Sequence, residues 1–525
     1  MNNNRYNIII ALLGVVLGVL ITLIGLKITD GNRKFDGDYN RWRKLNLILQ
    51  EVQKHYVDTI DMPAMTDAAV TAALAELDPH SVYLPPVKLQ ESDAELAGNF
   101  EGIGITFNVP NDTAIVLNGI PGGPSEKAGL SAGDRIMKVD DKVIAGTKTP
   151  QDSMVRMMKG PAGTKVKISV SRAGQMIPFE ITRGKIPVHS VDAAFMVAES
   201  VGYIKLTKFS RTTFKEFEEA SEKLLESGMT HLILDLRDNT GGYFDQALLL
   251  SNEFLQKGDA IVYMEGLHRP RQQYDADGHG KLKDIRLTVL IDEGSASSSE
   301  IFSGAIQDND RGTIIGRRSF GKGLVQEPVN FTDGSGLRLT VARFYTPSGR
   351  CIQKPYDKNY NYDIYERYAH GEMTSADSMK VDSTALYYTV KGRRVYGGGG
   401  IIPDVFVPID TTKATRFFIN CNKKAVMMRF ASSMFDKYAS SLSKIDGFDG
   451  LERWMDEIDL EGQFLSYAAR VENLRPAAGE WEETKWYMMP QIKALVGRYS
   501  KLQDEAFYRF YLPIDNEFQT ALTER

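Results

Sequence analysis

The sequence predicts an α/β protein made of several folding units around a βαβ core. The chain has 525 residues, about three to four times the size of a typical domain, so two to four units are expected. Its middle part alternates short apolar runs with segments of helical spacing, which is typical of βαβ units. A hydrophobic content of 42% and a charged content of 25% exclude a collagen-like, coiled-coil or largely disordered chain.

Charge and cysteine content narrow the possible partners. With 63 Lys and Arg against 68 Asp and Glu, the chain has no basic excess to neutralise phosphates, so a nucleic acid is not an expected partner. The two cysteines, Cys351 and Cys421, exclude a disulfide framework and a Cys-rich zinc site, but leave a single bridge open. The sequence has no HExxH motif and no Cys/His cluster, so we expect neither a metal nor another cofactor.

The N-terminal region, 1–34, contains one extreme segment. Residues 8–26 carry no charge over nineteen residues and would span roughly 28 Å as a helix, which matches a bilayer core. The alternative is a cleaved signal peptide, but its apolar region is usually shorter, and no small-x-small cleavage site follows before Lys27. We therefore expect an uncleaved membrane anchor, although basic residues on both sides of it leave its orientation open.

A helical lead-in is expected over 35–96. Residues 36–57 and 63–77 show helical spacing with few breakers, and the prolines of LDPHSVYLPP, 77–86, stop the second helix. Over 97–185 the pattern changes to short apolar runs separated by glycines, which predicts five or six short strands and one helix at 150–158. This region should form a small barrel-like module.

Four residues suggest what the module binds. Gly102, Ile103, Gly104 and Ile105 place glycines where backbone N–H groups can approach a ligand, and a strand then begins. Such an arrangement suits the capture of a terminal carboxylate and the addition of a peptide as an extra strand, although a plain tight turn would give the same string. Together with PSEKAGLSAGDRIMKVDDKVI, 124–144, the region resembles a PDZ domain.

The region 186–410 is the predicted α/β core. Its apolar runs do not alternate with polar residues, so they predict strands of a mostly parallel sheet that is covered on both faces. The expected strands are 201–206, 231–236, 287–292 and 312–316, and the expected helices between them are 213–226, 244–255 and 298–307. Two polar insertions, 267–284 and 352–382, are expected to be surface excursions.

A serine-rich loop in this core is the best candidate for chemistry. In IDEGSASSSEIFSGAIQ, 291–307, a strand ends and a helix begins, so that one serine stands at a helix N-terminus, where negative charge is stabilised. Helix capping is the alternative explanation. A buried Lys322, neutral when substrate is bound, can accept the hydroxyl proton. Gln326 lies four residues further on, on the same face of an extended strand, and can orient the lysine.

Several strings of the chain resemble the carboxyl-terminal processing peptidases, also called tail-specific proteases. The matching strings, besides the PDZ segment, are GSASSSEI, DNDRGTIIG, FGKGLVQ, YTPSGR, YGGGGIIPD and LDPHSVYL, in one order over roughly 75–410. The resemblance implies a crotonase/ClpP-like βαβ protease core. It also implies Ser297 as the nucleophile, Lys322 as the general base and Gln326 as the third catalytic residue. Ser295 and Ser299 are then loop and capping residues and second choices for the nucleophile.

The resemblance also implies an oxyanion hole made by two backbone N–H groups. One should come from Ser298, which follows the nucleophile. The other should come from LRDNTGG, 236–242, where the sequence does not separate Gly241 from Gly242. The expected function is that of a serine endopeptidase that recognises protein C-terminal tails. It would act in the cell envelope, on the periplasmic side of the membrane.

Three other functions fit the sequence less well. A Ser-His-Asp hydrolase needs a histidine base, and none of the seven histidines lies in a recognised active-site string; His80 is expected to pack or to hydrogen-bond. A crotonase-type acyl-CoA enzyme and an inactive PDZ scaffold both conflict with the presence of the serine, lysine and glutamine.

Residues 411–525 lie outside the resemblance. Their stripe, Ile492, Leu495, Val496 and Tyr499, predicts a helix that belongs to a core or supports a homo-oligomer or adaptor contact.

Overall fold

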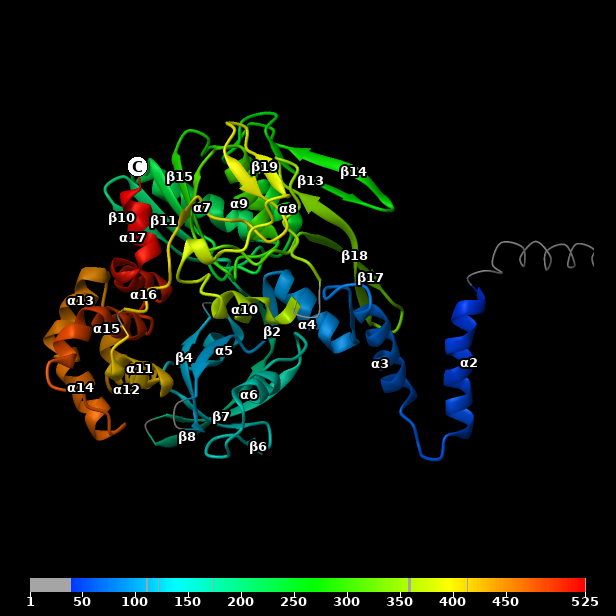
Figure 1. The fold of residues 1–525 in the computed structure, drawn as a ribbon. Helices are drawn as coiled ribbons and strands as arrows, with labels where there is room; N and C mark the ends of the chain where they lie inside the picture. The colour runs from blue at the N-terminus through cyan, green and yellow to red at the C-terminus, as the bar shows by residue number, and fades with distance from the viewer. Residues whose placement is uncertain are drawn as a thin grey trace, which may run out of the picture. The chain divides into compact units, whose positions relative to one another are not determined.

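The computed structural model describes residues 39–109, 112–120, 122–172, 174–356, 360–412 and 414–524 (Figure 1). The expected membrane anchor, 8–26, lies outside these residues. Within the described ranges, no helix is both long enough and apolar enough to cross a membrane. The chain divides into two compact units, Met1–Leu77 and Asp78–Arg525.

The described part of the first unit contains two helices, α2 (Tyr39–His55) and α3 (Met62–Ala75). The Asp61 carboxylate caps α3 by accepting the N–H of Ala64 at 3.0 Å. Pro63 lies in the first turn, where its missing N–H costs no intrahelical hydrogen bond. Helical spacing therefore predicted this part of the lead-in correctly.

A small β-module comes next, drawn in cyan in Figure 1. Its sheet has the order β3-β4-β5-β7-β8, with β6 paired to β5, and β3 is an edge strand. The strands are β3 (Ile105–Asn108), β4 (Ala114–Gly119), β5 (Arg135–Val139), β6 (Lys142–Val143), β7 (Lys165–Arg172) and β8 (Gln175–Thr182). The helices are α5 (Pro124–Ala128) and α6 (Gln151–Met158), and the pair β2 (Asn99–Gly102) and β9 (Gly184–Pro187) lies beside them in sequence. The predicted strands and the predicted helix at 150–158 are confirmed.

The central sheet of the second unit has the order β10-β11-β12-β15-β16-β21. Neighbours from β11 to β21 are parallel, and β10 is antiparallel to β11. The strands are β10 (Val191–Ala198), β11 (Val201–Leu206), β12 (His231–Asp235), β15 (Arg286–Ile291), β16 (Thr313–Gly316) and β21 (Val405–Phe406). The connecting helices are α7 (Thr213–Glu226), α8 (Phe244–Asn252) and α9 (Ser298–Asp308). The predicted alternation of strands and helices is confirmed. Helix α8 ends before the predicted residue 255, because Phe254 and Leu255 lie in a turn that still buries them in the core.

A second sheet, β1-β18-β13-β14, lies outside the central one, and β17 pairs with β18. Its strands are β1 (Val82–Leu84), β13 (Ala260–Gly266), β14 (Arg269–Asp275), β17 (Leu324–Asn330) and β18 (Gly336–Tyr345). Helix α4 (Pro86–Leu96) follows β1. Part of the insertion 267–284 is thus a strand. Residues 82–84 of the LDPHSVYLPP segment form β1, which pairs with β18.

The insertion 352–382 is not simply a surface excursion, and this prediction was wrong for part of it. It contains η2 (Tyr360–Tyr362), α10 (Asp363–Ala369) and η3 (Ala376–Ser378), and β19 (Leu386–Tyr388) pairs with β20 (Arg394–Tyr396) beyond it. Lys354, Tyr360 and Arg367 are buried. The Arg367 guanidinium donates to the carbonyl oxygens of Arg318 and Ser319 at 2.6 and 3.1 Å. The polar composition of the insertion therefore reflects hydrogen bonds to a core loop as well as exposure to solvent.

The C-terminal region is helical, as predicted, and packs against two different partners. Its helices are α11 (Arg416–Lys423), α12 (Val426–Leu442), α13 (Phe448–Glu457), α14 (Leu460–Arg470), α15 (Glu480–Gly497), α16 (Asp504–Tyr511), η4 (Leu512–Ile514) and α17 (Asn516–Thr523). Helices α11 to α16 share one apolar cluster with Ile115 and Leu117 of β4. Ile492 and Val496 are fully buried in that cluster. The predicted stripe is therefore core packing in this structure.

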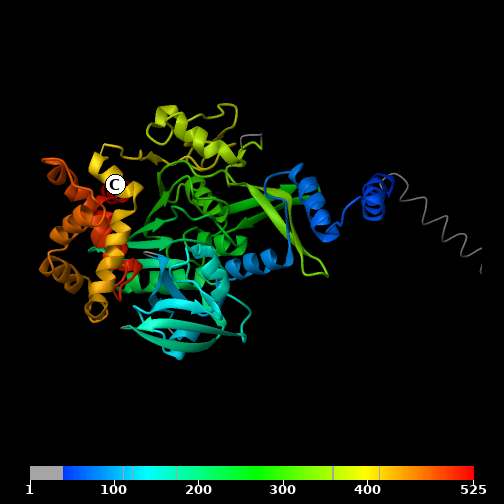
Figure 2. The same cartoon turned by 90° about the horizontal axis from the view of Figure 1, so that it is seen from below.

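The last helices cover one face of the central sheet. Tyr203, Ile233, Leu290 and Ile315 alternate along their strands with residues that face α7, α8 and α9. Their side chains pack against apolar residues of η4 and α17, namely Leu512, Phe518 and Ala521. In Figures 1 and 2 these helices, drawn in orange and red, lie beside both the cyan module and the green core. The expected cover on both sheet faces thus comes partly from the end of the chain.

Cys351 and Cys421 are both free thiols.

Candidate active site

Three loops meet at one edge of the central sheet. They follow the carboxyl ends of β12, β15 and β16, which lie at the same edge because these strands are parallel. The first carries Gly241 and Gly242, the second carries Ser297 and the third carries Lys322. Backbone hydrogen bonds join the three. Ala296 donates to the Asn239 carbonyl at 3.0 Å, and Phe320 donates to the Ser295 carbonyl at 3.0 Å.

Ser297 stands directly before α9 in an unusual backbone conformation. Its φ is +54° and its ψ is −111°, a region that non-glycine residues rarely adopt and that costs about 1–3 kcal/mol. Ser297 is partly exposed, whereas its neighbours Ala296 and Ser298 are buried. A strained serine at the N-terminus of a buried helix lies where the helix dipole and free N–H groups stabilise negative charge.

The two second-choice serines have structural roles. Ser295 is fully buried, and its hydroxyl donates to the Leu236 carbonyl at 2.8 Å. Ser299 is also fully buried, and its hydroxyl donates to the Asn239 carbonyl at 2.8 Å. Both bonds hold the serine-rich loop against the loop after β12. They leave Ser297 as the one partly exposed serine of the run 295–299.

The buried carboxylate of Glu300 links the Ser297 and Lys322 loops. Its Oε2 accepts the backbone N–H groups of Ser297 at 2.8 Å and of Lys322 at 2.9 Å. Its Oε1 accepts the N–H of Gly321 at 2.7 Å and the hydroxyl of Ser319 at 2.5 Å. Burial raises the pKa of Glu300, and these four hydrogen bonds lower it, with a net shift upward. Since Ser297 and Lys322 share one acceptor oxygen, their backbones lie side by side.

Lys322 is mostly buried, and this changes its acidity. Burial lowers the pKa of its ammonium below the ordinary 10.5, and the charge of Arg338 lowers it further. The carboxylates of Glu300 and Asp78 act in the opposite direction but do not reverse the shift. A lowered pKa makes the neutral amine, which is the form able to accept a proton, available at lower pH.

Gln326 belongs to a separate hydrogen-bond chain that begins in the LDPHS turn. Its Nε2 donates to Thr340 Oγ1 at 3.3 Å, and that hydroxyl donates to Asp78 Oδ1 at 3.1 Å. Asp78 also accepts the hydroxyl of Ser81 at 2.6 Å. Among the residues that the structure describes, no hydrogen bond joins the side chain of Gln326 to that of Lys322. The negative charge of Asp78 raises the pKa of Lys322, so this carboxylate links Gln326 to Lys322.

The glycine turn distinguishes its two candidates by their N–H groups. The N–H of Gly241 donates to the side chain of Asn239 at 2.9 Å. In the described part of the chain, neither Gly242 nor Ser298 has a hydrogen-bond partner for its N–H. The hydroxyl of Ser298 donates to the Gly242 carbonyl at 3.0 Å, which ties the two residues together. Gly241 lies so close that a Cβ there would stand 2.8 Å from Ser298 N and 2.9 Å from Ser297 Cβ.

The β-module places its four candidate residues around the start of an edge strand. Gly102 ends β2, Ile103 and Gly104 form the turn, and Ile105 begins β3. Gly104 has a φ of +72°, and the buried Ile103 accepts the N–H of Ser125 on its carbonyl at 2.9 Å. The turn is therefore held against the N-terminus of α5. The unpaired edge of β3 has the geometry needed to add a peptide strand.

Sequence reasoning missed Glu300, Asp78 and Thr340. Glu300 had a signal, because Ser297 and Glu300 stand at the spacing of a capping box, S-x-x-E, at the start of a helix. Asp78 had only the ordinary turn signal of an Asp-Pro pair, and Thr340 had none. His80 hydrogen-bonds to the hydroxyl of Tyr360, as predicted. Burial and the nearby Lys322 charge lower the pKa of His80 to about 4, so it is neutral near pH 7.

The pH dependence of activity should follow Lys322. Protonated lysine cannot accept a proton, so kcat/KM should rise with pH through the folded-state pKa of Lys322, below the ordinary 10.5. Replacing Arg338 removes a positive charge that lowers this pKa, so Arg338→Gln should move the rising limb to higher pH. Measured kcat/KM against pH for both proteins checks this. An unmoved limb would exclude Lys322 as the titrating group.

Comparisons with known proteins identify the families to which two parts of the chain are similar. Peptidase family S41 matches residues 200–363, which include all three candidate catalytic residues, and the PDZ domain family matches residues 102–182. A carboxy-terminal-processing protease of Bartonella bacilliformis is 35% identical over 347 residues, covering 65% of this chain and 78% of that protein. The carboxy-terminal processing protease CtpA of Bacillus subtilis is 34% identical over 328 residues, covering 62% of this chain and 68% of that protein. A solved photosystem II D1 C-terminal processing protease is 26% identical, with a TM-score of 0.39, covering 71% of this chain and 88% of that one.

Proposed function

Because the chain belongs to the carboxyl-terminal processing proteases of peptidase family S41, which are serine-type peptidases with a PDZ domain, we propose that it cleaves polypeptides by a Ser297 nucleophile with Lys322 as general base. The observation that carries this proposal is the Glu300 carboxylate, whose single Oε2 accepts the N–H groups of both residues. Two loops that are separate in sequence are thereby held together at the N-terminus of α9. If Ser297 only capped helix α9, a mostly buried lysine beside it would not be needed.

The proposed reaction follows from the groups present. Neutral Lys322 takes the proton of the Ser297 hydroxyl while Oγ attacks the peptide carbonyl carbon. The negative charge on the carbonyl oxygen is stabilised by the N–H groups of Ser298 and Gly242, which have no other partner among the described residues. Lys322 then returns the proton to the leaving amine, and an acyl-enzyme remains. Water attacks this ester and loses a proton to Lys322, which passes it to Oγ of Ser297 as the acid leaves, so that the serine hydroxyl and the neutral lysine are restored.

Gln326 is proposed to orient Lys322 from the far side of the site. Its amide is fixed by Thr340, which in turn is fixed by the Asp78 carboxylate. Asp78 also raises the pKa of Lys322 against the effect of burial, so it opposes complete deprotonation of the base. The Asp78–Thr340–Gln326 chain is thus proposed to position Lys322, while the charge of Asp78 limits the lowering of its pKa.

The PDZ domain is proposed to supply substrate recognition. A protein C-terminus would place its carboxylate at the backbone N–H groups of the Gly102–Ile105 turn and pair its last residues with the edge of β3. The relatives' names state that they process carboxy termini, which agrees with this mode of binding. No cofactor is needed for either step.

Two wider expectations are kept as proposals. The parallel strands β11, β12, β15 and β16, with their crossover helices, support a crotonase/ClpP-like protease core. The nineteen-residue apolar segment 8–26 supports a membrane anchor, and we propose that the protease lies on the periplasmic side of the envelope. Fractionation of cells into membrane and soluble material checks the anchor directly.

A pair of peptides tests the proposed function. One peptide ends in an apolar residue with a free carboxylate, and its control has the same sequence with a C-terminal amide. The free acid should be cut, and the amide should lose about 10-fold or more in kcat/KM, because charge-assisted hydrogen bonds to the carboxylate are lost. Mass spectrometry of the products measures both. Equal cleavage of the two would refute tail recognition, and binding of the acid without any cleavage would refute the peptidase.

A further inference from the structure

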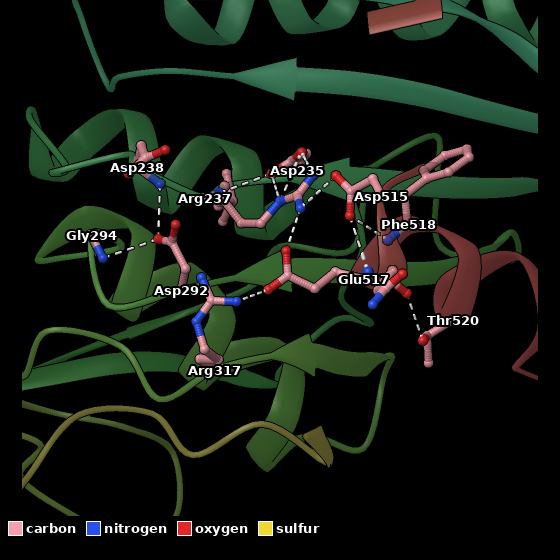
Figure 3. A network of polar contacts seen from close by, with 12 residues as sticks. Asp235, Arg237, Asp238, Asp292, Gly294, Arg317, Asp515, Glu517, Phe518 and Thr520 are labelled. Carbon is pink, nitrogen blue, oxygen red and sulfur yellow. Dashed lines mark hydrogen bonds and ion pairs between the residues drawn. The ribbon is translucent and has the colours of Figure 1, made fainter. Parts of the chain in front are cut away.

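The start of the last helix, α17, contacts two of the three loops that form the candidate active site. Residues Asp515 and Glu517 lie at the start of α17, far outside the matched family regions, which end at residue 363. Figure 3 shows their carboxylates meeting the guanidinium groups of Arg237 and Arg317. Arg237 follows β12, on the way to the glycine turn, and Arg317 follows β16, on the way to Lys322.

Arg237 is held by three carboxylates. Its Nη2 pairs with Asp235 Oδ2 at 2.6 Å, its Nη1 pairs with Asp515 Oδ2 at 2.7 Å, and Nη1 also contacts Glu517 Oε2. The side chain of Arg237 is only 12% exposed. Burial raises the pKa of Asp235, but the charges of Arg237 and Lys205 outweigh this and hold its pKa well below the ordinary value. The cation is therefore compensated from both the sheet and the C-terminal helix.

Glu517 joins the two arginines. Its Oε2 contacts Arg237 Nη1, and its Oε1 contacts Arg317 Nη1. The side chains of Arg317 and Glu517 are 12% and 9% exposed, so solvent cannot replace either partner. Arg317 has one other ion pair among the described residues, to Glu293 at 2.8 Å. Among the residues that the structure describes, Glu517 is thus the one side chain whose ion pairs bridge the loop after β12 to the loop after β16.

The middle loop is tied into the same region. Asp292, at the end of β15, accepts the N–H of Asp238 at 2.9 Å and the N–H of Gly294 at 3.0 Å. Asp238 lies next to Arg237, and Gly294 lies in the loop that leads to Ser297. Polar contacts therefore connect all three loops: Asp292 joins the loops after β12 and β15, and Glu517 joins the loops after β12 and β16.

We propose that Glu517 is a positioning residue of the peptidase, and that α17 is a built-in part of its active centre rather than a detachable appendage. This inference rests on the proposed function for its catalytic consequence only. The Glu517 carboxylate contacts both guanidinium groups and so fixes the spacing between the glycine turn and the Lys322 loop. The apolar side chains Phe518 and Ala521 hold α17 on the sheet independently of the carboxylate. Loss of the charge should thus loosen the loops without releasing the helix.

The experiment compares Glu517→Gln with a matched control in the full chain. The control is Glu505→Gln, which removes a charge from α16, where Glu505 forms an ion pair with Arg509 at 2.8 Å. Hydrogen–deuterium exchange should speed up in 236–242 and 317–323 for Glu517→Gln and stay unchanged for Glu505→Gln. With peptide substrate, kcat should fall between about 10- and 100-fold for Glu517→Gln, with KM nearly unchanged, because misplaced loops slow the chemical step.

The two readouts separate the inference from the proposed function. Faster exchange in both loops supports the positioning role even if no peptide is cut, since exchange needs no substrate. Unchanged exchange in the loops would overturn the inference, whether or not the wild type is active. If the wild type cuts peptide and Glu517→Gln cuts it at the same kcat, the inference fails while the peptidase assignment stands. Glu517→Asp keeps the charge but cannot reach both arginines, so it should give an intermediate kcat.

Discussion

Replacing Ser297 by alanine should reduce kcat by roughly 10 000-fold or more and leave the protein folded. The hydroxyl is the only atom of Ser297 that the proposed chemistry uses, and the backbone N–H that binds Glu300 remains in the variant. Its removal leaves only substrate binding and the oxyanion groups. The measurement is peptide cleavage at saturating substrate, with thermal unfolding of the same samples to show that the fold persists.

A matched control lies on the same helix. Ser303 is fully buried, and its hydroxyl donates to the Ser299 carbonyl at 2.8 Å within α9. Ser303→Ala removes the same atom from the same helix and should keep kcat within a few-fold. Undiminished cleavage by Ser297→Ala would transfer the nucleophile to another group and sink the assignment.

Two variants of Lys322 test its role as the base. Lys322→Ala removes the base, and Lys322→Arg keeps the positive charge but cannot lose its proton. Both should be inactive if Lys322 acts as a neutral base. Activity retained by the arginine variant would show that the group works as a fixed cation instead.

Replacing Glu300 by glutamine should lower both stability and activity. Three of the four donors to this carboxylate are backbone N–H groups, which cannot turn to accept a hydrogen bond. The amide NH2 of glutamine would face at least one of them, and an unsatisfied buried N–H costs about 1–3 kcal/mol in the free energy of unfolding. Because the Ser297 and Lys322 loops lose their common acceptor, kcat should fall by about 100-fold.

The control for Glu300→Gln is a buried carboxylate at the other end of the same helix. Asp308 accepts Arg350 Nη2 at 2.7 Å, and both side chains are fully buried. Asp308→Asn should lower the free energy of unfolding, measured in denaturant, but should change kcat little at a temperature where the protein stays folded. Equal losses of kcat in both variants would mean that Glu300 acts through general stability and not through the two loops.

Much of the fold could be read from local patterns. Strands β11, β12, β15 and β16 are continuous apolar runs, and the predicted ranges agree with the observed ones within one residue. The family resemblance, which rested on several short strings in one order, is confirmed by the family match and by the relatives. Ser297 and Lys322 were named as partners from their residue types and from that resemblance. The structure brings their backbones together on the Glu300 carboxylate.

The rest depended on contacts between distant parts of the chain. Thr340 and Asp78 are 262 residues apart and meet only because β1 pairs with β18. Arg237 and Glu517 are 280 residues apart and meet only because the C-terminal helices cover the central sheet. Periodicity within a window cannot reveal such pairs. The choice between Gly241 and Gly242 was also out of reach, since it depends on where the Asn239 side chain points.

Strand β4 of the PDZ domain contributes side chains to two different apolar cores. Its side chains Ala114 and Val116 face the domain's own core, while Ile115 and Leu117 lie among the C-terminal helices. Swinging the domain away would expose these two side chains to water, at about 1.5–3 kcal/mol for each. It would also break the hydrogen bond between Asn108 and Tyr499 at 2.7 Å. If the PDZ domain captures a chain end as proposed, these contacts hold that end at a fixed distance from Ser297, and the number of residues between the end and the cleaved bond should be constant.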